Sequence, residues 1–141
     1  MATVLFERNI AAYLETKGFG RFDKSAPSIF LQSAPDSPDA AIIVRPRGGG
    51  GAPQYPQAGI IQRSVIEILV RGATAAWEAT KLIAIAITDL FRNPTDAELI
   101  FANNVGYSVE VLNHEPAALP EDQRQRVYFS NQFAFTFYRK D

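Results

Sequence analysis

The C-terminal segment carries the most regular pattern in the sequence, an alternation of period two that runs over a dozen residues. One set of positions is apolar with a single exception, Asn131, and comprises Val127, Phe129, Phe133, Phe135 and Phe137. The intervening positions hold Tyr128, Ser130, Gln132, Ala134, Thr136 and Tyr138. Because successive side chains of a strand point to opposite faces, this pattern predicts a long strand with one buried face and one wetter face.

A second stretch, from residue 60 to residue 91, changes from a strand pattern to a helix pattern. Residues 62–71 are rich in β-branched and apolar side chains, which favours a central strand that Gly72 ends. Thr74 is a suitable N-cap for the helix that follows. Spacings of three and four predict a buried stripe of Ala76, Thr80, Ile83, Ile87 and Leu90, widened by Leu82 and Ala86 on one side and by Trp77, Ala84 and Phe91 on the other.

The far face of this helix is expected to be polar but to include one apolar residue, Ile85. Its other members are Glu78, Lys81, Thr88 and Arg92. Such a helix has more apolar surface than one sheet face usually covers. We expect it to be the core helix of the domain, and contact of Ile85 with a neighbouring subunit is a hypothesis.

The N-terminal region predicts a helix followed by two short strands. On the helix, Thr3 is the expected N-cap, Gly18 the C-terminal stop, and one face carries Val4, Leu5, Ile10, Ala11 and Leu14. The strands are expected at residues 29–32 and 41–45. Between them, Pro35, Asp36, Ser37, Pro38 and Asp39 favour a turn whose carboxylates bond the backbone.

Residues 45–56 are the one low-complexity segment, with Arg45 and Arg47 preceding the glycines Gly48, Gly49, Gly50 and Gly51 and two further prolines. Glycine and proline cannot continue a strand ladder, so a long flexible loop is expected, of a length that is usually functional or mobile. The two arginines suit bidentate contact with carboxylates of a neighbouring subunit or another protein, and DNA is a second candidate partner.

Beyond the core helix, the sequence predicts a short strand at residues 98–102, a turn at 103–106, a strand at 107–111 and a polar loop from Pro116 to Gln125. Connections of hairpin length dominate this order of elements. Residues 1–141 are therefore expected to form a single α+β domain, with a mainly antiparallel sheet and two main helices packed on one face.

Composition excludes several classes of protein. A net charge of −1 argues against electrostatic nucleic-acid binding by the monomer as a whole, and the absence of cysteine excludes disulfides and thiolate metal sites. The first ten residues lack the pattern of a signal peptide, and no apolar run approaches the roughly 18 residues that span a bilayer. We expect a soluble protein without membrane contact.

No catalytic, cofactor or metal site is predicted. His114 is the only histidine and stands beside a predicted loop without a second histidine or a cysteine as partner. Asp36 and Asp39 suit turn formation better than acid–base chemistry or cation binding. The glycine run lacks the Gly-Lys-Ser/Thr ending and the following helix of a phosphate loop.

From Ala11 onward, the order of features resembles the minor capsid and tail terminator proteins of long-tailed bacteriophages. The matching stretches are Ala12–Leu14, Gly18–Gly20, Ile29–Leu31, Ala34–Ile42 with its Pro-Asp-Ser-Pro-Asp, the Gly-Gly-Ala-Pro of Gly50–Pro53, Ile66–Gly72 and Phe129–Phe133. Arg45-Pro46-Arg47 and the additional glycines depart from that pattern.

This resemblance implies a non-enzymatic virion protein, synthesised in the host cytoplasm and assembled in the tail or neck region. It implies a homo-oligomeric ring, commonly a hexamer, at the head-proximal end of the tail tube, where the ring stops polymerisation and meets the head connector. Partners would be the tail tube protein, a head-completion or connector protein and, in passing, genomic DNA in the lumen. The interface candidates are the loop at 45–56, the turn at 35–39, Ile85 and exposed strand edges.

Two other functions remain open from the sequence. One is a head-completion or connector protein of the phage neck. The other is a small hydrolase or nucleotide-binding enzyme, for which Asp36, Asp39 and His114 would have to converge.

Overall fold

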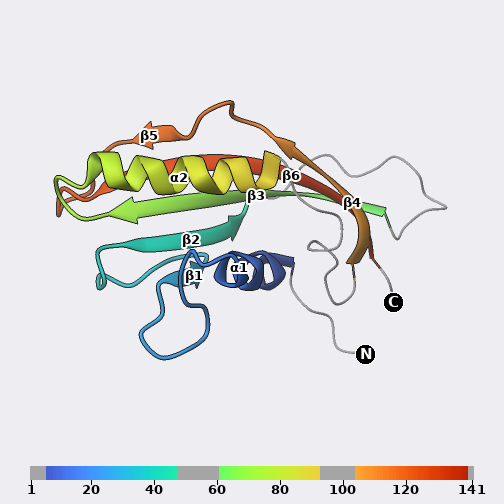
Figure 1. The fold of residues 1–141 in the computed structure, drawn as a ribbon, viewed down its shortest axis with the longest axis horizontal. Coiled ribbons are helices and arrows are strands. Elements are labelled where there is room, and N and C mark those ends of the chain that lie inside the picture. Colours follow the sequence, from blue (N-terminus) through green and yellow to red (C-terminus); the bar gives the residue numbers. More distant parts are fainter. Residues whose placement is uncertain (1–5, 48–60, 93–103, 140–141) are drawn as a thin grey trace.

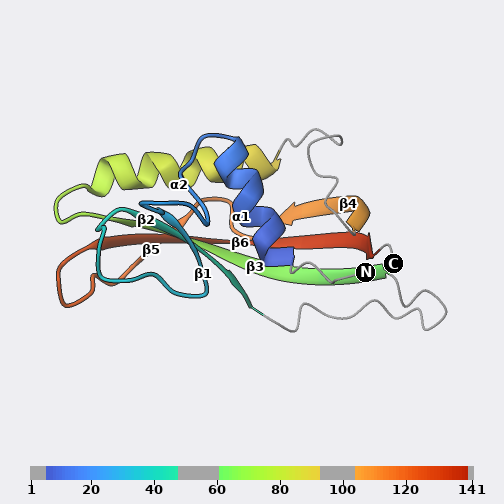
Figure 2. The same ribbon diagram turned by 90° about the horizontal axis from the view of Figure 1, so that it is seen from below.

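The described residues of the computed structural model, 6–47, 61–92 and 104–139, form two helices and six strands. The elements in chain order are α1 (Phe6–Thr16), β1 (Ile29–Leu31), β2 (Ala41–Pro46), β3 (Ile61–Gly72), α2 (Trp77–Arg92), β4 (Asn104–Val111), β5 (Ala117–Leu119) and β6 (Val127–Arg139). Figure 1 shows α2 along β3 and β6 and α1 over β1 and β2. In Figure 2 both helices lie on the same side of the sheet, which confirms the predicted α+β class and its single helical layer.

The strands form one sheet in the order β1-β2-β3-β6-β4. β4 pairs with the C-terminal part of β6 and β5 pairs with its N-terminal part, so that both strands lie on the same side of β6. Every pairing is antiparallel except that of β1 with β2, which is parallel. The mainly antiparallel sheet is therefore confirmed, although the connection at 32–40 leads to a parallel neighbour instead of a hairpin.

The central pair of strands is β3 and β6, which pair over their whole length from Ile61–Tyr138 to Gly72–Val127. On the helix side, buried apolar side chains come from β2, β3 and β6: Ile42, Val44, Ile66, Ile68, Val70, Phe129, Phe133 and Phe135. The apolar set predicted for the last strand is buried from Val127 to Phe135, but the opposite face is less wet than expected, because Ser130 and Ala134 are buried too. Asn131, the exception, is also buried on this face.

The end of α1 has the geometry of a Schellman motif. Gly18 has a φ of 87°, its N–H donates to Glu15 O over 2.9 Å, and the Phe19 N–H donates to Leu14 O over 3.0 Å. A left-handed residue at this position favours glycine, which confirms the predicted stop. Ile10, Ala11 and Leu14 are buried as expected, whereas Thr3, Val4 and Leu5 lie outside the described residues.

The predicted start of α2 is wrong. The Thr74 hydroxyl donates to Arg124 O over 3.1 Å, and the first helical acceptor is the Ala76 carbonyl, which receives the Thr80 N–H. A tight turn precedes the helix, closed by the Ala76 N–H on Ala73 O, with Ala75 at a φ of 68°. This extra turn moves the N-cap position two residues along the chain.

The predicted buried stripe of α2 is only partly correct. Its buried residues are Thr80, Ala84, Ile87, Thr88 and Phe91, whereas Ile83 is 41% and Leu82 59% exposed. Thr88, expected on the polar face, faces the core. The helix is rotated in this way because Phe91 packs on Phe133 and Phe135, with ring centroids 5.0 and 5.5 Å apart. Near its start, small side chains allow close approach, since a Cβ on Gly72 would overlap Thr80 Oγ1.

Several strand boundaries also differ from the predictions. β2 continues through Pro46, which is tolerated because β1 pairs only as far as Val44 and leaves this part of β2 at the sheet edge. The turn expected at 103–106 is wrong where the structure describes it, because Asn104, Val105 and Gly106 belong to β4, with a bulge between Val105 and Tyr107. β5 lies inside the predicted polar loop. The strand expected at 98–102 and the loop from Gly48 to Pro56 lie outside the described residues.

Candidate functional site

A buried carboxylate lies at the centre of the sheet face opposite the helices. Glu67 of β3 accepts hydrogen bonds from Arg45 Nε over 2.7 Å and from Ser130 Oγ over 2.6 Å, and Arg47 Nη1 lies 3.7 Å from it. Burial alone would raise the pKa of Glu67, but these donors and the two cations lower it below its usual value. Arg45 and Arg47, predicted as partner contacts, therefore both contact a carboxylate of their own chain.

Arg71 attaches the loop at 35–39 to the sheet. Its guanidinium donates through Nε to Asp39 O at a distance of 2.9 Å. Through Nη2 it donates to Pro35 O and to Pro38 O, each at a distance of 2.7 Å. The side chain is only 4% exposed. Within the described ranges its acceptors are these neutral carbonyls, and no carboxylate forms a salt bridge with it.

Arg126, also buried, attaches the same loop from the other side. It donates to Asp122 Oδ2 over 2.7 Å and to Asp36 O over 2.7 Å, and it lies within 4 Å of the carboxylates of Asp36 and Asp39. The predicted turn at 35–39 is thus fixed by arginines that bind its carbonyls. Carboxylates bonded to the loop's own backbone, as the sequence led us to expect, are not among the described contacts.

Asp122 is held in a set of converging donors. Desolvation raises its pKa, but the Arg126 and Arg124 backbone N–H groups, the Tyr128 hydroxyl and the Arg126 side chain lower it well below the usual value. The hydrogen bond with Asp122 in turn raises the pKa of the Arg126 guanidinium. Both oxygens of the Asp122 carboxylate therefore already accept hydrogen bonds from donors of the same chain.

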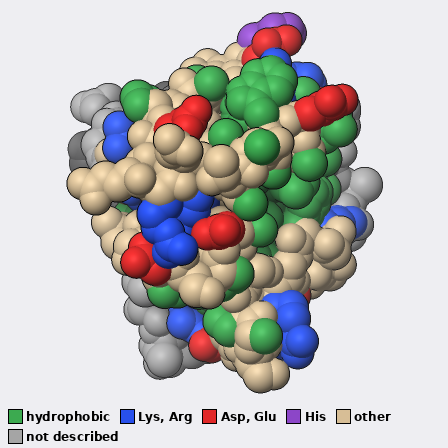
Figure 3. Space-filling model, turned by 90° about the vertical axis from the view of Figure 1, so that its left-hand side faces the viewer, with side chains coloured by type: hydrophobic (Ala, Val, Ile, Leu, Met, Phe, Trp, Pro, Cys, Tyr) green, Lys and Arg blue, Asp and Glu red, His purple; other side chains and the backbone are tan. Residues whose placement is uncertain are grey.

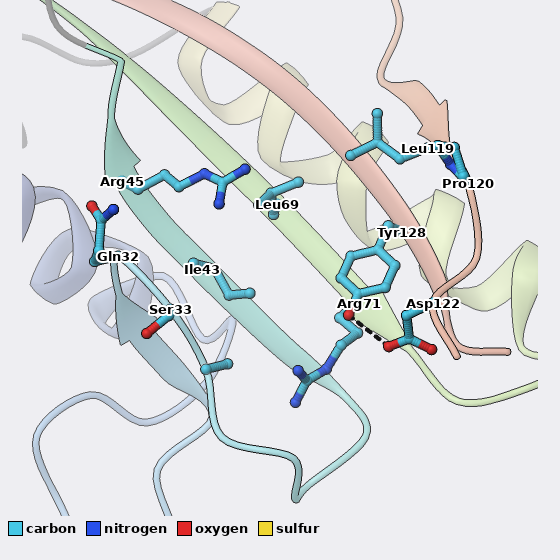
Figure 4. A pocket seen from close by; sticks show the side chains of 11 residues that line it. Gln32, Ser33, Ile43, Arg45, Leu69, Arg71, Leu119, Pro120, Asp122 and Tyr128 are labelled. Carbon is cyan, nitrogen blue, oxygen red and sulfur yellow. Dashed lines mark hydrogen bonds between the residues drawn. The ribbon is translucent and has the colours of Figure 1, made fainter. Parts of the chain in front are cut away.

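Between these arginines lies a groove of about 440 Å³ on the helix-free face. Figure 4 shows Ile43 and Leu69 on its floor, Leu119 and Pro120 along one side and Gln32 and Ser33 along the other. Arg45 lies at one end, and Arg71 lies near the opposite end with Tyr128 and Asp122. The groove combines apolar walls with two guanidinium groups.

A second surface lies on α2. Ala79, Leu82, Ile83 and Ala86 are all exposed and follow one another at helical spacing, so they form a continuous stripe that we name the apolar flank of α2. Ile83 also lines a smaller cleft of about 140 Å³ together with Phe19, Ile42 and Val70. Figure 3 shows hydrophobic side chains gathered on this end of the molecule. Trp77, half-exposed, packs edge-to-face with Phe129, with ring centroids 5.5 Å apart.

The remaining predicted site residues lie apart from both surfaces or are not described. Ile85 is half-buried, two positions from Ile83 and so roughly 160° away from it around the helix. Gly48, Gly49, Gly50 and Gly51 lie outside the described residues. In the loop at 35–39, the side chain of Asp36 is 81% exposed and that of Asp39 is 45% exposed.

The residues required for the enzyme hypothesis do not converge. Asp36 and Asp39 lie beside Arg126, at the start of β6, whereas His114 follows Asn113, whose carbonyl accepts from Asn131. About five residues of extended chain, roughly 17 Å, separate Arg126 from Asn131, so the two aspartates and His114 lie near different parts of β6. Among the described residues no group of three or more His, Cys, Asp or Glu side chains is placed to hold a metal ion.

The model of the bacteriophage tail terminator protein family matches residues 13–139, most of the chain and both surfaces described above. The chain belongs to this bacteriophage tail terminator family. It is accordingly a structural tail protein of phages and a component of the virion. A search of curated proteins finds no match. None of the described helices is long and apolar enough to cross a membrane.

For a tail terminator, the relevant features are surfaces, and the sequence pointed to only some of them. Arg71, Arg126 and Asp122 were not predicted, although the two arginines carry a signal in hindsight. Arg71 interrupts an apolar central strand, and Arg126 immediately precedes the phenylalanine stripe. A buried charge requires hydrogen-bond partners, and except for the nearby Asp122 these come from the loop at 35–39, which is distant in the sequence from both arginines.

Proposed function

We propose that this tail terminator assembles as a homo-oligomeric ring, the hexamer that its family resemblance implies, at the head-proximal end of the tail tube. There it stops tube polymerisation and joins the tube to the head connector or a head-completion protein. In this proposal the protein acts by assembly and not by catalysis. The observation that carries it is the exposure of the apolar flank of α2, Ala79, Leu82, Ile83 and Ala86, which the other described residues leave uncovered.

Exposed apolar surface of this kind supports a protein contact for a physical reason. Large aliphatic side chains at 41% and 59% exposure lose free energy when a partner removes them from water, by roughly 25 cal/mol for each Å² buried. The cleft that Ile83 lines with Phe19 and Ile42 provides a recess beside the flank. A neighbouring subunit that inserts an apolar side chain there would extend the core across the interface.

The loop at 35–39 supports a contact of another kind. Arg71 and Arg126 fix its backbone, so that it can present Asp36 and Ser37 without a large loss of conformational entropy on binding. We propose that this loop contacts a neighbouring subunit or the tail tube protein. Gly48 to Gly51, with Arg47 before them, are proposed as an arm toward the same partners, with DNA in the lumen as a further contact.

The ring is tested by measuring the mass of the protein alone and with purified tail tube protein, with images of the particles by negative-stain electron microscopy. Ile83→Ser and Ile85→Ser form a matched pair, because the same change is made on opposite sides of α2. Ile83→Ser is expected to shift the assembly toward monomer while the circular dichroism spectrum stays unchanged. Ile85→Ser is expected to retain assembly.

Each alternative outcome has a clear meaning. If only Ile85→Ser abolished assembly, the interface would lie on the polar side of α2, as the sequence hypothesis stated. A wild-type protein that stayed monomeric both alone and with the tail tube protein would contradict the ring. Rings that bind a purified connector but not the tail tube would favour a head-completion role.

A further inference from the structure

The groove on the helix-free face contains a cation that the described chain does not neutralise. Arg71 is 4% exposed and forms hydrogen bonds only with the carbonyls of Pro35, Pro38 and Asp39 among the described residues. Carbonyl dipoles offset part of the cost of burying a guanidinium, but they supply no opposite charge. A carboxylate that forms a charge-assisted hydrogen bond with such a buried guanidinium would supply the missing negative charge.

One nitrogen of Arg71 is free to make that contact. Nε and Nη2 are occupied by the three carbonyls, and no hydrogen bond of Nη1 is found within the described part of the chain. Among the described residues, the only side-chain nitrogen or oxygen that is both fully buried and without a hydrogen-bond partner is Asn9 Nδ2. Arg71 Nη1 also has no partner among them but is not such an atom, so it keeps some contact with solvent. Arg71 is one of the residues that line the groove, so we take the groove as the side from which its two free N–H donors are reached.

The other charged groups of the groove do not compete for this position. Asp122, the only acidic residue among the described residues that line the groove, is already bound by Arg126 and Tyr128. Arg45, its other cation, is paired with Glu67 over 2.7 Å. The charge that the described residues leave uncompensated in the groove is therefore positive and belongs to Arg71.

We infer that this groove binds an acidic side chain of a partner protein, Asp or Glu, flanked by apolar residues in an extended segment. The carboxylate would accept from Arg71 Nη1, and the adjacent apolar side chains would cover Ile43, Leu69 and Leu119. A volume of about 440 Å³ accommodates a few side chains. Capture of a chain terminus normally uses a nest of backbone N–H groups, whereas the donor here is a single guanidinium, which favours an internal acidic residue.

The test uses the full chain and a capped peptide, acetyl-Ala-Leu-Glu-Leu-Ala-amide, titrated by two-dimensional ¹H–¹⁵N NMR. Saturable shifts are expected at the amides of Ile43, Leu69, Arg71 and Tyr128. The same peptide with Gln in place of Glu should bind about tenfold more weakly, as expected for loss of a charge-assisted hydrogen bond.

Two leucines of equal exposure provide a matched pair of variants. Leu119 lines the groove and Leu112 does not, and both are 38% exposed. Leu119→Glu places a carboxylate at the rim and should weaken binding of the Glu peptide at least about fivefold by repulsion. Leu112→Glu should leave it unchanged. Because both positions are at the surface, each variant is expected to fold.

Four results would overturn the inference. They are an absence of saturable shifts, equal affinity for the Glu and Gln peptides, equal weakening by Leu112→Glu and Leu119→Glu, or equal binding of a peptide whose only carboxylate is its free C-terminus. All four are independent of ring formation, because they are measured on the unassembled chain.

Discussion

Asn131 of β6 donates a hydrogen bond from Nδ2 to Thr88 Oγ1 of α2 over 2.9 Å, and both side chains are buried. Thr88 Oγ1 in turn donates to Ala84 O over 3.0 Å, and Asn131 Nδ2 also reaches Asn113 O over 3.2 Å. The one polar residue in the phenylalanine stripe is thus satisfied by the helix that covers it. This pair helps fix the rotation of α2 over the sheet.

We predict that Thr88→Val lowers the free energy of unfolding by about 1 kcal/mol, because Asn131 retains its bond with Asn113. Asn131→Ala should cost about 2–3 kcal/mol, since it also leaves a void and the Asn113 carbonyl without its donor. Urea unfolding of both single variants and the double variant checks this. A coupling energy near zero would mean that the two side chains do not interact in solution.

Ile83 and Ile87 are one helical turn apart and should respond very differently to the same substitution. Ile87 is 1% exposed, so Ile87→Ala should cost about 2–5 kcal/mol by opening a cavity. Ile83→Ala should change the stability of the monomer by less than about 1 kcal/mol, because the side chain is already exposed. Thermal and urea unfolding of the unassembled protein distinguish them. Equal losses would show that α2 is rotated differently from this structure.

The contact of Gly72 with Thr80 predicts a substitution and its rescue. Gly72→Ala places a Cβ against Thr80 Oγ1 and should cost about 1–3 kcal/mol through displacement of α2. Adding Thr80→Ala removes the hydroxyl and should recover part of that loss, after correction for the effect of Thr80→Ala alone. If the double variant were no more stable than the additive expectation, this close approach would not be the cause.

Asp122 predicts a loss of stability in acid. Its pKa is lowered in the folded protein, so its contribution is present above the unfolded-state value of 3.8 and is lost as the pH falls below that value. The melting temperature should therefore fall between about pH 4 and pH 2. Asp122→Asn should be less stable at pH 7 and show a shallower decline in acid. Glu121→Gln, a neutralisation of the exposed neighbouring residue, is the control and should keep the wild-type slope.

Local sequence patterns predicted the structure correctly where a single local interaction determines it. The alternation from Val127 to Phe135 predicted the face of β6, because an apolar stripe has to leave water whichever partner covers it. Gly18 predicted the end of α1 because a left-handed residue is required by backbone geometry alone. The family resemblance likewise depended on short motifs that remain recognisable without coordinates.

The tertiary structure decided what depends on partners distant in the sequence. The apolar residues of α2 allowed two rotations, and packing of Phe91 on Phe133 and Phe135, with Thr88 on Asn131, selected the one that leaves Ile83 exposed. The arginines give the clearest example. From the sequence alone, Arg45 and Arg47 were the cations available to a partner, but the fold brings Glu67 to both and leaves Arg71 without a carboxylate among the described residues. The local sequence determines which side chains carry charge, whereas the distances that pair those charges exist only once the strands have assembled.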